Sequence, residues 1–199
     1  MMTIGQLSKL NKTIVASNAE FKKMSKPQKR VRIAQDVLAQ IKARRLVPVR
    51  ENGYICDAEG VENQAPDTEV SAVAERVTSC QVCGIGSLFV VGIQRDESLK
   101  LGDLNDVKER LNNPGTYPAT AFGLDNVDQK DIHKFLGKYF TKSQLQLIED
   151  VFETDATYLD EDGDEESASE RFAAKYPEDE ERLVAIMKNI VKNEGVFIP

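Results

Sequence analysis

The feature that most constrains the fold is an unbroken helical pattern over residues 25–45, SKPQKRVRIAQDVLAQIKARR. Ser25 is a favourable N-cap, and Pro27 falls in the first turn, where its missing N–H costs nothing. Apolar side chains then recur at helical spacing and form one stripe: Val31, Ala34, Val37, Leu38 and Ile41. The pattern predicts a long amphipathic helix with cations at both ends.

Other segments favour helix as well. Helical patterns recur after residue 69, and Thr141 with Gln144 has the spacing of a capping box at a later helix start. The segment LVPVRENGYIC differs, because β-rich arms flank the turn-forming Asn52-Gly53 pair and Pro48 favours an edge strand. We therefore predict a mainly α fold, with about six or seven helices in one compact domain over residues 1–199 and a small β-hairpin near 46–56.

Charge is distributed asymmetrically, although the formal net charge is only −7. Residues 1–50 carry twelve Lys and Arg against two Asp and Glu, a balance of +10. Residues 149–181 carry fifteen Asp and Glu against two cations, a balance of −13. This separation indicates a basic contact surface, an acidic contact surface, or attraction between the two, and the alternative is a pair of solvated faces.

Two sets of charged side chains are the candidates for partner contacts. We predict that residues 154–168 form a mobile acidic loop, because carboxylates crowd a segment with few apolar side chains. No register of this run fits an EF-hand, since Gly and the acids never fall at the required positions together. The predicted anion- or partner-binding cations are Lys26, Lys29, Arg30, Arg32, Arg44 and Arg45. The predicted acidic contacts are Asp160, Asp162, Asp164, Glu165 and Glu166.

The motif that suggests chemistry is C-x-x-C at Cys80 and Cys83, within TSCQVCGIGSLFVVGI. Together with Cys56 and His133, the only histidine, this pair could supply the four ligands of a zinc site. A second hypothesis is a redox pair, since a thiol at a helix N-terminus gains reactivity, but no βαβ pattern surrounds it. The third hypothesis, which we favour, is that both thiols are small buried hydrophobes at the start of a glycine-spaced apolar helix. No other cofactor is expected.

Several function classes are disfavoured by the sequence. The longest apolar run, 82–93, is shorter than the about 20 residues of a membrane span, so we expect no membrane contact. The first residues lack a signal peptide's apolar core, and an odd number of cysteines fits a reducing cytoplasm. Nucleic-acid binding is not expected, because the helix after Thr141 carries acidic side chains that phosphates would repel. Walker, G-x-S-x-G and H-E-x-x-H motifs are missing, which favours a protein that is not an enzyme without excluding an Asp/Glu-based one.

Four segments together resemble a group of uncharacterised small accessory proteins encoded by tailed bacteriophages. They are KPQKRVRIAQDVLAQI, CQVCGIGSLF, FTKSQLQLIEDVFE and ERLVAIMKNIVKNEGVFIP, and they cover about half of the chain. The resemblance implies no site residues, but it implies a setting in the host cytoplasm. Accessory proteins of this kind commonly bind and redirect host enzymes or blunt bacterial immune systems.

We therefore expect a non-enzymatic phage accessory protein that binds a host or bacterial-defence protein, in an inhibitory or host-takeover role. One alternative is a protein that sequesters a signalling nucleotide, with phosphates on Lys29, Arg30 and Arg32. The other alternative is a small zinc-binding module. The sequence is compatible with a homo-oligomer in each case.

Overall fold

The computed structural model describes residues 18–50, 53–61, 64–96, 99–113, 122–154 and 167–199. Within these ranges the chain is mainly helical, with nine helices and a small three-stranded sheet in one compact domain. The mainly α prediction is confirmed, but the predicted helix number was too low because short helices fill the segments between the long ones. No described helix is long and apolar enough to cross a membrane.

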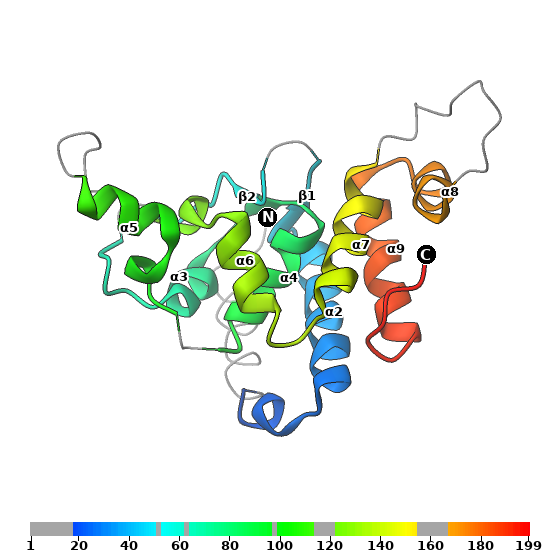
Figure 1. The fold of residues 1–199 in the computed structure, drawn as a ribbon, viewed down its shortest axis with the longest axis horizontal. Coiled ribbons are helices and arrows are strands. Elements are labelled where there is room, and N and C mark those ends of the chain that lie inside the picture. Colours follow the sequence, from blue (N-terminus) through cyan, green and yellow to red (C-terminus); the bar gives the residue numbers. More distant parts are fainter. Residues whose placement is uncertain (1–17, 51–52, 62–63, 97–98, 114–121, 155–166) are drawn as a thin grey trace.

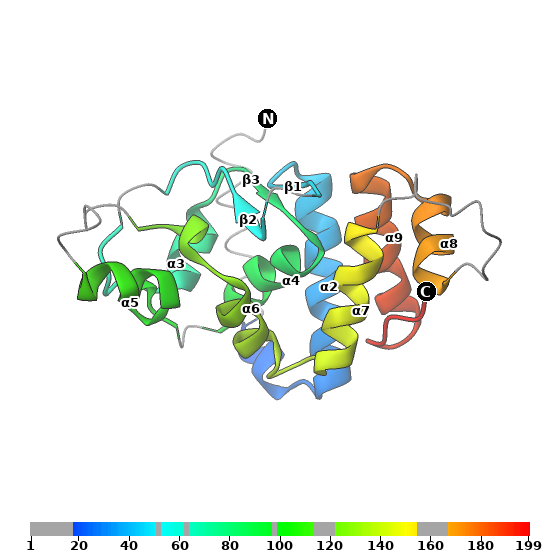
Figure 2. The same ribbon diagram turned by 45° about the horizontal axis from the view of Figure 1, so that its top comes forward.

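The elements run along the chain from a short helical turn at 18–23 to the long last helix. They are α2 (Lys26–Lys42), β1 (Leu46–Pro48), β2 (Ile55–Cys56), α3 (Val70–Arg76), β3 (Cys80–Val82), α4 (Gly84–Ile93), η1 (Leu101–Asp103), α5 (Asn105–Asn112), η2 (Leu124–Asn126), α6 (Gln129–Leu136), α7 (Lys142–Glu153), α8 (Ala168–Lys175) and α9 (Asp179–Lys192). Figures 1 and 2 place α5 and α8 at opposite ends of the long axis, with α4 in the middle.

The first long helix forms as its sequence predicts. Ser25 caps α2 in a capping box, because its hydroxyl accepts from the N–H of Gln28 and the Gln28 side chain accepts from the N–H of Ser25. Ala34, Val37 and Ile41 of its predicted apolar stripe are buried, whereas Val31 and Leu38 are half-buried. The helix α9 lies along α2 in the most extensive helix–helix contact of the described residues (Figure 2). The C-terminal end of the basic helix α2 therefore lies beside the acidic start of α9, where Arg44 pairs with Glu180.

The predicted hairpin near 46–56 is wrong. The strand order is β1-β3-β2, so β1 and β2 flank β3 and do not pair with each other. Leu46 lies opposite Cys80 in a parallel pair, and Ile55 lies opposite Val82 in an antiparallel pair. Both arms of the predicted hairpin pair with β3 instead, because the buried residues of β3 place it in the core between them. Pro48 lies on an edge strand, as expected.

Residues 80–93 form a strand and then a helix, whereas we expected a helix from Cys80 onward. The helix α4 begins only at Gly84, with Cys83 as its N-cap, and every residue of α4 is buried. Gly86 is required there, because a Cβ at this position would stand 1.8 Å from the backbone oxygen of Tyr54. α4 is consequently the central helix, contacted by α2, α3, α6 and α7.

The last three helices form the end of the molecule that carries the candidate site. Thr141 caps α7 by accepting from the N–H of Gln144, but the expected capping box is incomplete. The Gln144 side chain instead bonds the backbone of Phe197, as both donor and acceptor. α8 and α9 both pack against α7, so α7 sets the spacing of the two helices that follow it.

Candidate functional site: a basic groove between α8, α9 and the C-terminal tail

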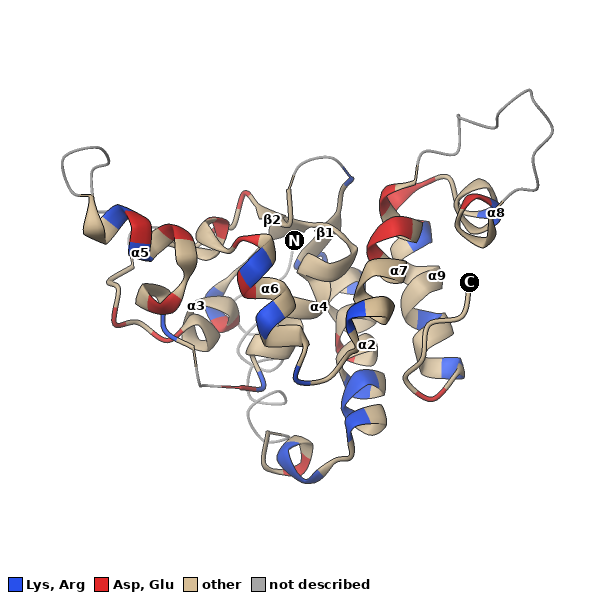
Figure 3. Ribbon diagram, viewed as in Figure 1, with Lys and Arg blue, Asp and Glu red and all other residues tan. Residues whose placement is uncertain are grey.

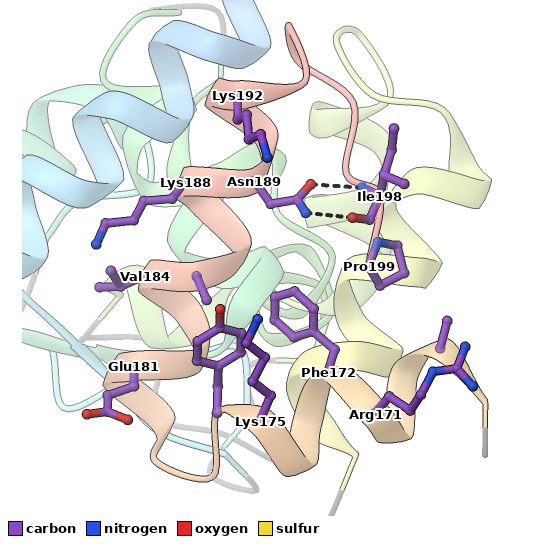
Figure 4. Close-up of a pocket in the computed structure, with 13 residues that line it drawn as sticks. Arg171, Phe172, Lys175, Glu181, Val184, Lys188, Asn189, Lys192, Ile198 and Pro199 are labelled. Atoms are coloured by element: carbon purple, nitrogen blue, oxygen red, sulfur yellow. Dashed lines mark hydrogen bonds between the residues drawn. The ribbon is translucent and has the colours of Figure 1, made fainter.

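A groove of about 800 Å³ opens between α8, α9 and the tail at residues 198–199 (Figure 4). We call it the basic groove. Its lining from α8 and the residue after it is Ala168, Arg171, Phe172, Lys175 and Tyr176. Its lining from α9 and the tail is Glu181, Val184, Ala185, Lys188, Asn189, Lys192, Ile198 and Pro199.

Helical periodicity explains why these residues share one groove. The α8 residues recur at spacings of three and four from Ala168 to Lys175, and the α9 residues do the same from Glu181 to Lys192. Side chains at these spacings lie on one face of a helix. Each wall of the basic groove is therefore one continuous helix face.

A buried guanidinium holds the walls in place. Arg182 on α9 is fully buried and donates to four backbone oxygens. Two of these oxygens, on Phe152 and Thr154, lie at the end of α7, and the Arg182 nitrogens are 2.9 and 2.5 Å from them. The other two, on Ala173 and Tyr176, lie at the end of α8, at 3.2 and 2.8 Å from the Arg182 nitrogens. A cation at the C-termini of two helices satisfies their last carbonyls and suits their dipoles. This contact fixes α8 relative to α9.

The tail that closes the groove is held by side-chain bonds to its backbone. The Asn189 amide donates to the oxygen of Ile198 at 2.5 Å and accepts from its N–H at 2.9 Å (Figure 4). Arg30 of α2 donates to the oxygen of Gly195 at 2.6 Å and to that of Tyr139 at 3.0 Å. These contacts leave Ile198 57% exposed at the groove.

The groove surface combines apolar side chains with an excess of cations. The Phe172 ring packs against Tyr176 and Phe197, with ring centres 4.9 and 5.5 Å apart, and it is half-buried, as is Val184. Four of the five charged lining side chains are Lys or Arg, and Glu181 is the exception. Figure 3 shows that Lys and Arg recur along α9, although the chain as a whole is acidic. The groove is thus a local basic site on an acidic protein.

The cations predicted from the sequence do not form one free surface. Lys26 is exposed, and Lys29 is half-buried near the Phe21 ring. Arg32 pairs with Asp36 on its own helix, and Arg44 pairs with Glu180 of α9. Part of the basic set therefore contacts the acidic half of the same chain, which was one of the sequence-based alternatives.

Arg45, which we predicted as a partner contact, is buried and therefore cannot reach a partner. Its side chain is buried and donates to the carbonyl oxygens of Ala74, Glu75 and Val77, at the end of α3. Burial lowers the pKa of this guanidinium. Arg45 thus satisfies the last carbonyl groups of α3 from within the core. The predicted acidic contacts, in the stretch 155–166, lie outside the described residues.

The predicted zinc ligands are spread over several elements. Cys56 ends β2, Cys80 begins β3, Cys83 caps α4, and His133 lies on α6. Among the described residues, which include all four, no group of three or more His, Cys, Asp or Glu side chains could hold a metal ion. The zinc site stays a prediction that this arrangement does not support, and metal analysis decides it.

The environment of the thiols disfavours redox or nucleophilic chemistry. Burial raises the pKa of Cys80 to about 12, and it raises that of Cys83 to about 12 despite the N–H that Gly86 donates to its sulfur. A thiol with such a pKa holds almost no thiolate at neutral pH, and the thiolate is the nucleophile. Both thiols pack in the core, as the favoured hypothesis expected.

The single histidine joins a small polar cluster beside α4. His133 Nε2 lies 3.7 Å from Glu149 Oε2, and the Tyr54 hydroxyl donates to Glu149 Oε1 at 3.0 Å. Burial and this carboxylate raise the pKa of Tyr54. The tyrosine is thereby held protonated, so the cluster connects the residue before β2 with α6 and α7 without activating a nucleophile.

None of the site residues predicted from the sequence lines the basic groove. The α8 wall was missed because the predicted acidic loop extended to residue 168 and no helix was assigned to residues 168–175. A signal was present: Ser167 and Glu170 form a capping box, with the hydroxyl accepting from the Glu170 N–H and the carboxylate accepting from the Ser167 N–H. The spacing of Arg171, Phe172 and Lys175 then matches one face of a helix.

Comparisons of the chain with protein-family models, with curated proteins and with solved structures gave no match. The function must therefore be argued from the site itself.

Proposed function

We propose that the protein is a non-enzymatic binding protein that contacts a partner protein through the basic groove. The observation that carries this proposal is the groove lining, in which four cations and one carboxylate surround apolar side chains. Interfaces of this kind combine an apolar centre with a charged rim that selects the partner. The excess of cations predicts an acidic segment on the partner.

The partner, in this proposal, is a host or bacterial-defence protein met in the bacterial cytoplasm. The sequence resemblance to phage accessory proteins supports this setting. An acidic segment that docks in the groove would be occluded from its other partners. Inhibition by occlusion requires no chemistry from the bound protein, which agrees with the high pKa of the C-x-x-C thiols.

Sequestration of a signalling nucleotide is the alternative. The cations first assigned to phosphates are largely engaged, since Arg30 bonds two backbone oxygens and Arg32 pairs with Asp36. The basic groove, however, has a volume suited to a small ligand and offers rings near cations, as in the contact of the Lys175 ammonium with Tyr176 at 5.4 Å. Mass spectrometry of small molecules released from the purified protein tests this alternative directly.

The experiment for the leading proposal is capture from bacterial lysate by the tagged full chain and by two charge-reversal variants. The test variant is Lys188→Glu/Lys192→Glu, in the groove. The matched control is Lys42→Glu/Lys134→Glu, which makes the same change of net charge on exposed lysines elsewhere. Lys42 and Lys192 each end a helix, so the unfavourable contact with the helix dipole is similar in both variants.

We expect the wild type and the control to retain a stoichiometric partner that the groove variant loses. The partner, once identified, should show an acidic segment that crosslinks to α8 or α9. Capture of the same partner by the groove variant would contradict the proposed surface, and absence of any stoichiometric partner would contradict the proposed function.

A further inference from the structure

The geometry points to one kind of occupant, and we infer that the basic groove receives a short amphipathic, acidic α-helix of the partner protein. This inference rests on the proposed function and deepens it. It concerns the conformation and the side-chain pattern of the segment that binds, which the excess of cations alone does not specify.

The shape of the groove fits a helix. Its lining runs from Glu181 to Lys192 along α9, which is about 16 Å at 1.5 Å per residue, and from Ala168 to Lys175 along α8, which is about 10 Å. A helix of two to three turns, about 8–11 residues, has the same length. Figure 4 shows α8 crossing the lower end of the groove, so a bound helix would lie along α9 with α8 at one of its ends.

The backbone of the groove argues against an extended peptide. Both walls are helices, whose N–H and C=O groups bond within the helix, and none of the described residues that line the groove belongs to a strand. Addition of a β-strand needs an open sheet edge, which these walls do not offer. The Asn189 side-chain amide does not serve an extended peptide either, because its N–H donates to the Ile198 oxygen and its oxygen accepts from the Ile198 N–H. A ligand is therefore recognised through side chains.

The apolar contacts suit the apolar face of a helix. Phe172, Val184 and Ile198 present half-buried or exposed apolar surface from α8, α9 and the tail. Ala168 and Ala185 leave room for side chains of the incoming helix. An amphipathic helix bound in such a groove uses apolar anchors at i, i+3, i+4 and i+7. Burial of a Leu or Ile anchor contributes about 1.5–3 kcal/mol of transfer free energy.

The positions of the cations predict where the bound helix carries acidic side chains. Lys188 and Lys192 lie along the α9 wall, and Arg171 and Lys175 lie on α8, which crosses the end of the groove (Figure 4). A helix lying along α9 would meet Lys188 and Lys192 beside its apolar stripe and the two α8 cations near one end. Carboxylates at those positions would each meet a cation, whereas Lys or Arg would be repelled. The cations are spread along two walls, an arrangement suited to a helix more than to one compact phosphate group.

The test uses three synthetic peptides of about 14 residues, titrated into the full-length protein and followed by fluorescence anisotropy. The first has Leu at i, i+3, i+4, i+7 and i+11 and Glu at most other positions. The second has the same composition in scrambled order, which removes the apolar stripe but keeps the charge. The third is the first peptide with two central prolines, which prevent helix formation. Far-UV circular dichroism of each mixture reports helix formed on binding.

We expect the striped peptide to bind at least about tenfold more tightly than the other two and to gain helix when it binds. Lys188→Glu/Lys192→Glu should weaken this binding at least about tenfold, and Lys42→Glu/Lys134→Glu should change it less than about twofold. A folded circular dichroism spectrum of each variant shows that the loss is local. Crosslinking of the bound peptide to α8 and α9 should map the site.

Four results would overturn the inference. Equal binding of the scrambled or proline peptide would show that the groove recognises charge alone, and the proposed function would stand. Binding weaker than about 1 mM for the striped peptide would have the same consequence if the groove variant still loses its lysate partner. Displacement of the striped peptide by a nucleoside diphosphate, or a homodimer that only the groove variant dissociates, would assign the groove to another occupant. Failure of both the peptides and the lysate capture refutes the proposed function itself.

Discussion

Replacement of Arg182 by Met should destabilise the protein strongly, because this buried guanidinium holds the ends of two helices. Its four hydrogen bonds reach backbone oxygens of Phe152, Thr154, Ala173 and Tyr176. Methionine replaces the aliphatic stem of Arg182 as far as Nε, but it lacks the rest of the guanidinium and donates no hydrogen bond. The variant therefore keeps the packing of the stem and removes the hydrogen bonds.

The magnitude follows from two opposing effects. Hydrogen bonds from a charged donor contribute about 1.5–3 kcal/mol each, so four of them set an upper range of about 6–12 kcal/mol. Removing the buried charge also removes its desolvation cost, which is several kcal/mol. We therefore expect the free energy of unfolding to fall by about 3–5 kcal/mol. At about 2–4 °C per kcal/mol for a chain of this size, the Tm should fall by about 6–20 °C.

Urea unfolding followed by circular dichroism measures this change, with Arg182→Lys and Arg44→Met as comparisons. Lysine keeps the charge but cannot reach all four oxygens, so we expect an intermediate loss. Arg44 is 66% exposed in its pair with Glu180, and its replacement should cost less than about 1 kcal/mol. A loss below about 1 kcal/mol for Arg182→Met would refute the assignment of Arg182 as the residue that fixes α8 relative to α9.

Three further predictions concern the core and the cysteines. Gly86→Ala should lower the free energy of unfolding by at least about 1–3 kcal/mol, because the new Cβ would overlap the backbone oxygen of Tyr54. Urea unfolding measures this change, and an unchanged urea midpoint would show that the backbone at Tyr54 moves away at no cost. Folding raises the pKa of Cys80 and Cys83 from 9.0 to about 12, so unfolding releases protons above pH 9, and stability should fall as pH rises from about 9 toward 12. A Cys80→Ala/Cys83→Ala variant should lose less stability over that pH range than the wild type, and equal losses would contradict the assignment. We expect elemental analysis to find less than about one zinc per four chains, and a stoichiometric amount would restore the zinc hypothesis.

The long helices were predictable because their signals are local. Ser25 and Pro27 mark the start of α2, and the apolar stripe that follows needs no knowledge of its partners. The strand β3 was not predictable in the same way. It is only three residues long, and the strands that pair with it lie more than twenty residues earlier in the chain. The strand is followed after one residue by the apolar helix α4, so the sequence shows no visible change from the two-residue period of a strand to the 3.6-residue period of a helix.

The candidate site depended even more on tertiary structure. Arg45 and Lys188 are both cations in helical segments of the sequence, and nothing near them in the sequence tells them apart. In the fold, however, Arg45 bonds the last carbonyl groups of α3 within the core, whereas Lys188 lines the basic groove. That difference arises from how α3, α8 and α9 are placed, which local patterns do not encode. The capping box at Ser167 could have revealed α8, but the proximity of α8 to α9 requires α7 and the buried contacts of Arg182.

The pairing of α2 with α9 has a consequence for synthesis on the ribosome. About 140 residues separate the end of α2 from the start of α9, so at about 5–20 residues per second α2 emerges roughly 7–30 s before its main partner. During that interval the apolar stripe of α2 lacks the part of its cover that α9 provides, and exposed stripes promote aggregation of nascent chains. The cations at both ends of α2 would then act as solubilising groups on an unfinished chain, before Arg44 meets Glu180 of α9.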